Sequence, residues 1–202
     1  MEKSKVYFTK TITKEKVVEM YQKLGIELPG KVAVKVHSGE KGNQNFLRPE
    51  FMKNMIDYIK GTVVECNTAY EGARNTTEKH KETMKEHGWS NLYSVDIMDS
   101  EEDIELPVEK GKHLKTNYVG SHLRNYDSML VLSHFKGHPM GGFGGSLKNL
   151  SIGIASSYGK AVIHGAGNPD EIWTADHNSF LESMAEAAGT ITKYFKDKKY
   201  KQ

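Results

Sequence analysis

Short apolar runs bounded by polar or turn-forming residues recur along the chain and predict a series of β-strands. Residues 31–37 alternate between polar and apolar side chains, which is the period of a strand. Residues 129–132 form an apolar run preceded by polar Asn125 and Asp127, as is typical of a buried strand. By the same reasoning, strands are predicted at residues 5–8, 31–37, 62–65, 93–98, 113–118, 129–134 and 161–164.

Helices are predicted where apolar residues recur at helical spacing or where start and stop signals occur. The predicted helices cover residues 13–24, a segment that begins at Pro49, residues 78–86 and residues 178–195. Gly25 and Gly88 follow two of them, and glycine is the residue preferred just after a helix C-terminus. Because strands and helices alternate, the sequence predicts an α/β fold with a central, mostly parallel sheet flanked by helices on both faces.

Composition narrows the class of protein. With 202 residues, the chain suits a single α/β domain over residues 1–202. Lys and Arg number 28 against 26 Asp and Glu, so no excess of charge indicates a nucleic-acid partner. No apolar run approaches the ~20 residues of a membrane span, and residues 1–5 lack the apolar segment of a signal peptide. We therefore expect a cytoplasmic protein that does not associate with membranes.

Residues 134–149 follow a predicted strand and are rich in glycine, histidine and lysine. Glycines let the backbone approach a ligand closely, and successive N–H groups can bind an anion. His138 is a candidate for proton transfer, and Lys148 supplies a cation or an amine nucleophile. The glycines expected to contact a cofactor are Gly142, Gly144 and Gly145.

Two other polar loops follow predicted strands. Asn67, Thr68 and Arg74 lead into a predicted helix, where their polar groups could hold an anion or simply form a turn and a helix cap, with Arg74 in solvent. The other loop begins at His37. Ligands bind at the carboxyl ends of parallel strands, so we expect His37, Asn67 and His134 at one edge of the sheet.

Histidines from separate segments could form a metal or cofactor site. His164 closes a predicted strand that returns towards the glycine-rich segment. We expect His138 and His164 to share an ion or cofactor, with His134 as a further ligand. Lys148 is expected to point into the same cavity as His138, the alternative being a surface lysine paired with a carboxylate.

Three segments, within a match over roughly residues 30–195, resemble the family of domains of unknown function numbered 362. The first contains Lys35-Val36-His37, Asn43 and Arg48-Pro49, and the second contains Asn67-Thr68, Tyr70, Gly72, Arg74 and His80. The third contains Ser133-His134-Phe135-Lys136-Gly137-His138, Gly142-Phe143-Gly144-Gly145, Lys148-Asn149, Gly153, Ala155-Ser156, Gly159-Lys160 and His164. Many members of that family are described as iron–sulfur centre proteins, so the resemblance implies redox character.

The chain departs from this family in its cysteines and its length. Members that hold clusters carry several cysteines after the histidine that corresponds to His164, whereas Cys66 is the only cysteine here. An iron–sulfur cluster held by this chain is therefore not expected, because thiolates hold such clusters. Cys66 also stands where the family is expected to have an aspartate. Relatives usually continue beyond the last helix, so we expect the sequence to be a truncated piece or a short variant.

A more distant resemblance concerns the cofactor-binding half of nickel-dependent lactate racemases. It rests on His138, the glycines that follow it, Lys148 and His164. In that family the lysine anchors a nicotinate-derived nickel pincer nucleotide, the later histidine binds nickel and the earlier one moves protons. The resemblance implies these three roles for Lys148, His164 and His138 respectively. The racemase's second domain has no counterpart here, so shared ancestry of the cofactor-binding half is implied rather than racemase activity.

Three functions are open on this basis. The first is a metal- or cofactor-binding protein of redox character, binding nickel or iron and a nucleotide-like cofactor, with a ferredoxin-like redox partner. The second is an enzyme that acts on a small anionic substrate by racemase-like acid/base or hydride chemistry. The third is a protein that binds an anion or nucleotide without catalysis. Metal analysis and intact mass would distinguish them.

Overall fold

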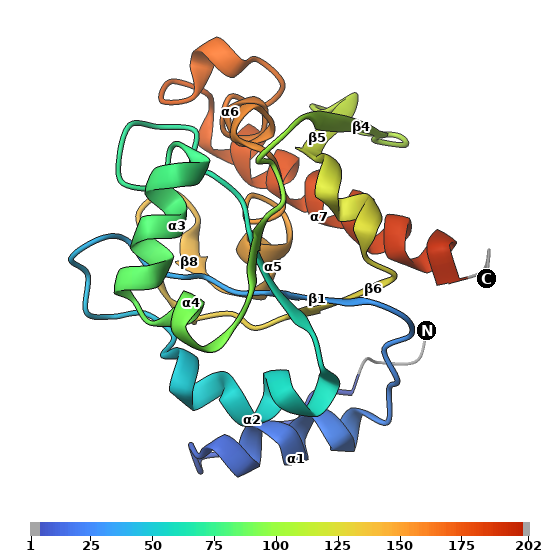
Figure 1. The fold of residues 1–202 in the computed structure, drawn as a ribbon. Coiled ribbons are helices and arrows are strands. Elements are labelled where there is room, and N and C mark those ends of the chain that lie inside the picture. Colours follow the sequence, from blue (N-terminus) through green and yellow to red (C-terminus); the bar gives the residue numbers. More distant parts are fainter. Residues whose placement is uncertain (1–4, 200–202) are drawn as a thin grey trace.

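The computed structural model describes residues 5–199, and a parallel sheet of four strands lies at its centre (Figure 1). The strand order is β3-β2-β1-β6. The strands are β1 (Val32–Lys35), β2 (Thr62–Glu65), β3 (Val95–Ile97) and β6 (Ser128–Val131). Ala33 of β1 lies opposite Thr62 on one side and Met129 on the other. The predicted α/β fold with a parallel central sheet is confirmed.

Helices cover both faces of this sheet, with α1 and α2 below it and α5 and α7 above it in Figure 1. The helices are α1 (Lys14–Leu24), α2 (Pro49–Ile59), α3 (Thr77–Glu86), α4 (Trp89–Leu92), α5 (Ser146–Leu150), α6 (Ser157–His164) and α7 (His177–Lys199), with 3-10 turns η1 (Ser121–Asn125) and η2 (Pro169–Glu171). No helix within residues 5–199 is long and apolar enough to cross a membrane.

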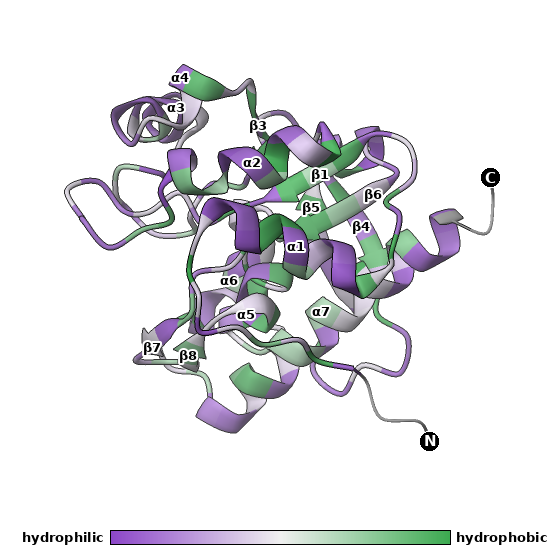
Figure 2. Cartoon of the chain, turned by 90° about the horizontal axis from the view of Figure 1, so that it is seen from below, coloured by the Kyte–Doolittle hydropathy of each residue, from purple (hydrophilic) through white to green (hydrophobic). Residues whose placement is uncertain are grey.

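The sheet is buried on both faces because successive side chains of each strand enter opposite halves of the core. Val34 packs in one apolar cluster with Ile56 of α2, whereas the adjacent Ala33 packs in another with Ile191 of α7. All four residues of β1 are buried. Figure 2 accordingly shows hydrophobic colour on β1 and hydrophilic colour on much of α1 and α3. The alternation in residues 31–37 therefore does not mark a solvent-facing side, as full burial is usual in parallel sheets.

The helix signals in the sequence act as expected. The Thr13 hydroxyl accepts a hydrogen bond from the Lys16 N–H at the start of α1, and Gly25 ends that helix in the left-handed conformation, with φ of 61°. Pro49 begins α2. These interactions are local, which explains why the boundaries of α1 and α2 were predictable.

Two small antiparallel sheets accompany the central one. β4 (Asp103–Pro107) pairs with β5 (Thr116–Gly120), and β7 (Lys136–His138) pairs with β8 (Gly142–Gly144). The glycine-rich segment is therefore a hairpin followed by the short helix α5, rather than one open loop.

Two predicted strands are wrong. Residues 161–164 form the end of α6, because Ser156 caps that helix and Ile163 packs against Phe180 and its neighbours. A short apolar run fits either a strand or a helix, and packing decides between them. Residues 5–8 form no strand; Val6 and Phe8 are exposed.

The side of the sheet on which new strands are added changes at β1. From β1 the chain proceeds to β2 and β3 on one side, and β6 is then added on the other side. Loops that leave β1 and β6 diverge at such a reversal and open a crevice beyond the carboxyl ends of the strands, where ligands bind. His37, Asn67 and His134 follow β1, β2 and β6 at this edge, as predicted.

Candidate functional site

A cavity of about 540 Å³ lies at the carboxyl edge of the central sheet. Its lining comes from the loops after β1, β2 and β6, from the hairpin β7–β8, and from α5 and α6. It thus occupies the crevice that the strand order creates.

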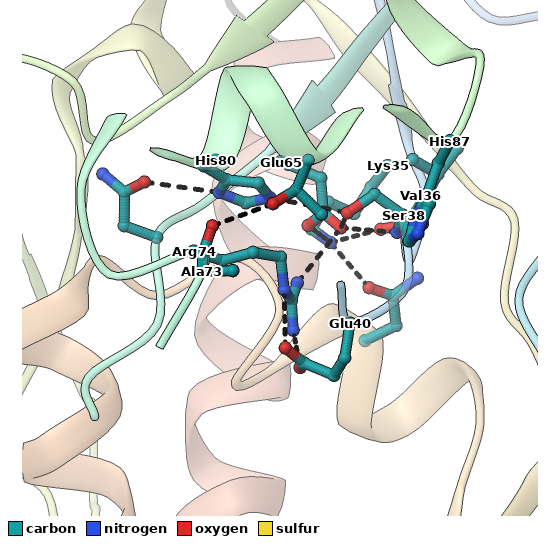
Figure 3. Close-up of polar contacts among 12 residues, drawn as sticks. Lys35, Val36, Ser38, Glu40, Glu65, Ala73, Arg74, His80 and His87 are labelled. Atoms are coloured by element: carbon teal, nitrogen blue, oxygen red, sulfur yellow. Dashed lines mark hydrogen bonds and ion pairs between the residues drawn. The ribbon is translucent and has the colours of Figure 1, made fainter. Parts of the chain in front are cut away.

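An ion pair between the last residues of two strands forms the floor of the cavity (Figure 3). Nζ of Lys35, at the end of β1, lies 2.6 Å from Oε2 of Glu65, at the end of β2, and both side chains are almost fully buried. The ammonium group also donates a hydrogen bond to Oδ1 of Asn149, at 2.8 Å. Lys35 therefore connects the sheet to α5. The α5 residue that it contacts, Asn149, directly follows Lys148 in the sequence.

The other oxygen of Glu65 orders the loop after β1. Oε1 accepts hydrogen bonds from the backbone N–H and the hydroxyl of Ser38, at 2.8 and 3.0 Å. Burial by itself raises the pKa of Glu65, but nearby Lys35, His80 and Arg74 outweigh it and hold the pKa far below its usual range. Glu65 is therefore a carboxylate whose charge is already balanced within the protein.

Arg74 is buried and paired, not in solvent. Its guanidinium forms an ion pair with Glu40, and one of its nitrogens lies 3.8 Å from Oε1 of Glu65 (Figure 3). Nε of Arg74 also donates to Glu40 at 3.2 Å. The interpretation of Arg74 as a solvated side chain is wrong. Arg74 lines the cavity, but its hydrogen-bonding capacity is largely used by Glu40.

Lys148, by contrast, has no carboxylate partner among residues 5–199. It lies on α5 and lines the cavity together with His138, as predicted, and it is partly buried. Burial, reinforced by the charges of Lys160 and Lys136, lowers the pKa of Lys148 to about 8. A lysine in this state is a good partner for an anion, because a nearby negative charge would relieve both effects.

Lys160 adds a second buried ammonium to the same cavity. It lies on α6, is 6% exposed and donates a hydrogen bond to the backbone oxygen of Ala155. Burial lowers the pKa of Lys160. Five basic side chains line the cavity (Lys35, Arg74, Lys136, Lys148 and Lys160) against the two carboxylates Glu40 and Glu65. Since both carboxylates are already paired, the cavity carries uncompensated positive charge.

The hydrogen bonds of His138 determine which of its nitrogens carries the proton. Nδ1 accepts hydrogen bonds from the backbone N–H groups of Met140 and Gly141, at 3.2 and 3.0 Å. In the neutral ring the proton therefore resides on Nε2, which acts as a donor. Burial lowers the pKa of His138, so the neutral ring is the relevant form.

His164 has the opposite arrangement. Its Nδ1–H donates to the backbone oxygen of Lys160 at 2.7 Å, which leaves a lone pair on Nε2. Burial lowers the pKa of His164 to about 4, so the lone pair is free at neutral pH. The cavity thus contains one imidazole that offers an N–H as a hydrogen-bond donor and one that offers a lone pair to accept a proton.

His134 and His37 line the same cavity. Nδ1 of His134 is buried without a hydrogen-bond partner in the part of the chain that the structure describes. Burial lowers the pKa of His37 to about 3, which keeps its ring neutral.

His138, His164 and His134, the residues of the predicted metal site, all line the cavity. Residues 5–199 contain no group of three or more His, Cys, Asp or Glu side chains placed to hold one. His138 in its present orientation directs an N–H, not a lone pair, from Nε2, whereas His164 retains a free lone pair. Metal binding by His138, His164 and His134 stays a prediction, as does nickel or iron.

The remaining predicted residues divide between the cavity and its surroundings. Gly144, Gly145 and Thr68 line the cavity, whereas Gly142, the first residue of β8, is exposed and does not line it. The Asn67 amide is occupied by internal contacts: its nitrogen donates to the Thr77 hydroxyl at 3.1 Å.

Cys66 is buried and behaves as a small apolar residue. It packs with the core on the α7 side of the sheet, and its thiol donates to the backbone oxygen of Ile154 at 3.3 Å. Burial raises the pKa of Cys66, so the thiol is neutral.

Sequence reasoning missed Lys35, Glu65 and Lys136 as site residues. A signal was present in the first two, because opposite charges end two otherwise apolar strands that the fold makes neighbours. Trp173 lines the cavity from the segment before α7, and no local sequence pattern indicates that it belongs to the site.

The family description "domain of unknown function (DUF362)" matches residues 32–196, which include every residue of the cavity. The chain belongs to the DUF362 family. No curated protein and no solved structure matches the chain. The segment that matches DUF362 thus includes the whole central sheet and the cavity.

Proposed function

We propose that the protein binds a small anion, of the size of a nucleotide-like cofactor, in the cavity at the carboxyl edge of the sheet. The observation that carries this proposal is the charge balance of the cavity: five basic side chains line it, and both of its carboxylates are already paired. Buried charge is costly unless it is compensated, so a bound anion would stabilise the protein.

Size and an unused polar atom support the same proposal. A volume of about 540 Å³ falls within the range of about 300–1,000 Å³ that small-molecule sites occupy. The unpartnered Nδ1 of His134 is the kind of buried atom that a ligand completes.

Lys148→Gln tests the proposal, because Lys148 lines the cavity and forms no ion pair within residues 5–199. We expect titration calorimetry with inorganic pyrophosphate to show binding to the parent protein that weakens about 10- to 100-fold in the variant, the value of a hydrogen bond to a charged group.

Lys81→Gln is the matched control, because Lys81 is an exposed lysine on α3. It should bind pyrophosphate as the parent does. Equal loss in both variants, or no binding by the parent of pyrophosphate, ribose 5-phosphate and nucleoside monophosphates alike, would contradict the proposal.

A second candidate function is acid/base catalysis on an anionic substrate. It is favoured by the complementary protonation of His138, which presents an N–H, and His164, which presents a lone pair. A ligand between them could lose a proton to Nε2 of His164 while the Nε2–H of neutral His138 donates a hydrogen bond to the oxygen that becomes negative. The basic side chains would hold the substrate and stabilise the negative charge that forms.

Solvent exchange tests this second function. Pyruvate, 2-oxoglutarate and dihydroxyacetone phosphate have carbon-bound protons made acidic by a carbonyl group. We expect NMR to show faster deuterium exchange into at least one of them with the protein than without it, and loss of that rate in His164→Gln. No acceleration by the parent would remove the acid/base role while leaving anion binding intact.

A further inference from the structure

Two aromatic side chains lie at the mouth of the cavity. Tyr70 follows β2, and Trp173 precedes α7; both line the cavity, yet they are 43% and 66% exposed. Their ring centroids are 6.2 Å apart and the rings are inclined by 50°. Segments far apart in the sequence therefore converge to place two large rings at one opening.

The two rings are not packed against each other face to face. At an inclination of 50° they touch without stacking, so much of the indole surface is left to solvent. The other tryptophan of the chain, Trp89, is fully buried. An exposed tryptophan at the entrance of a charged cavity is a surface that a planar ring can cover.

Tyr70 is also connected to the charged part of the site. Its hydroxyl lies 3.5 Å from Oε1 of Glu40, the carboxylate that pairs with Arg74. Lys148 and Lys160 line the same cavity from α5 and α6. Aromatic surface and uncompensated positive charge are thus two parts of one cavity.

We infer that the ligand is an anion that carries a planar heteroaromatic ring, with the ring on Trp173 and Tyr70 and the phosphate or carboxylate at Lys148 and Lys160. This inference rests on the proposed anion binding and adds the class of the ligand. A stacked ring gains dispersion contacts and removes the exposed indole from water, and aromatic side chains tolerate any flat ring.

The experiment separates the ring from the charge by comparing four phosphates. Ribose 5-phosphate has the anion without a ring, whereas AMP, UMP and pyridoxine 5′-phosphate each add a different heteroaromatic ring. We expect calorimetry to show at least one of these three binding about 10-fold or more tighter than ribose 5-phosphate, the usual gain from one stacked ring. That ligand should also quench the fluorescence of Trp173.

Substitutions assign the gain to the two rings. Trp173→Leu should remove most of the preference for the ring-bearing ligand, because it should weaken binding of that ligand far more than binding of ribose 5-phosphate. Tyr70→Leu should weaken the preference. In Trp173→Leu the remaining fluorescence comes from buried Trp89 and should not be quenched. Tyr58→Leu is the control, because Tyr58 is a similarly exposed tyrosine on α2 that does not line the cavity.

The outcomes separate this inference from the proposed function. Ribose 5-phosphate binding that none of the three rings strengthens would overturn the inference and leave anion binding standing. A ring preference that survives Trp173→Leu would also overturn it. If neither pyrophosphate nor any of the four phosphates binds, both the inference and the proposed anion binding are contradicted.

Discussion

At the scale of single residues, the cavity is defined by which charges have partners. Lys35 and Arg74 are each paired with a carboxylate, and they belong to the structure of the floor. Lys148 lines the same cavity without a carboxylate partner within residues 5–199. Identical residue types therefore have different roles, which depend on what lies next to them.

The pKa of Lys148 predicts how anion affinity depends on pH. Lys148 is charged below its pKa of about 8, and a bound anion raises that pKa by favouring the charged form. Affinity for ribose 5-phosphate should therefore fall by up to tenfold per pH unit above about pH 8. Calorimetry between pH 7 and 9.5 measures this pH dependence of the affinity.

Lys148→Arg separates this effect from other titrations. Arginine stays charged over the whole range, so the fall above pH 8 should largely disappear. An unchanged fall in this variant would assign it to another group, such as Lys160.

At the scale of elements, the site depends on how closely α6 approaches β5. A Cβ placed on Gly159 would lie 2.0 Å from the backbone oxygen of Tyr118, so only glycine permits the observed packing. The same helix carries Lys160 and His164 into the cavity. A shift of α6 would therefore move two cavity residues together.

Gly159→Ala tests this coupling between packing and binding. We expect it to lower the free energy of unfolding by about 2 kcal/mol, the usual cost of an overpacked contact, and to weaken anion binding. Urea unfolding and calorimetry measure the two effects.

The control for this substitution is Gly189→Ala. Gly189 lies exposed in α7, where an added Cβ meets open space. Its replacement should stabilise the protein by about 0.5–1 kcal/mol, because alanine is the better helix former. Equal stability of the two variants would show that the contact between α6 and β5 is not tight.

At the scale of the whole molecule, several histidines are held neutral by burial around the carboxyl edge of the sheet. Burial lowers the pKa of His37 and of His80 to about 3 and that of His164 to about 4. In the unfolded chain these rings accept protons below about pH 6.5. The unfolded state therefore binds more protons than the folded state between pH 6.5 and 4.

This difference predicts that stability falls as the pH drops below about 6.5. Each of the three rings contributes about 1.4 kcal/mol per pH unit in that range, and the sign follows from proton uptake on unfolding. Urea unfolding between pH 7.5 and 5 measures the slope, and His80→Gln should reduce it by about 1.4 kcal/mol per pH unit. Constant stability over this range would contradict the neutral, buried state of these rings.

The sequence by itself determined the features that depend on local interactions. Thr13, Gly25 and Pro49 mark helix ends through contacts within a few residues, and the apolar strand runs allow few other conformations. Alternation of strands and helices was sufficient to predict a parallel sheet, and with it the edge where His37, Asn67 and His134 lie. The glycine-rich segment was correctly identified as part of the cavity through His138, Gly144 and Lys148.

Only the tertiary structure decided which side chains act together. Four features depend on contacts between distant segments: the Lys35–Glu65 pair, the burial of Arg74, the convergence of Tyr70 with Trp173 and the helical state of residues 161–164. The tertiary structure also decides which ring nitrogen of His138 and of His164 carries the proton, because the folded hairpin and helix fix the backbone atoms that bind these nitrogens. Local patterns do not determine these contacts, since packing and desolvation set them once the chain is folded.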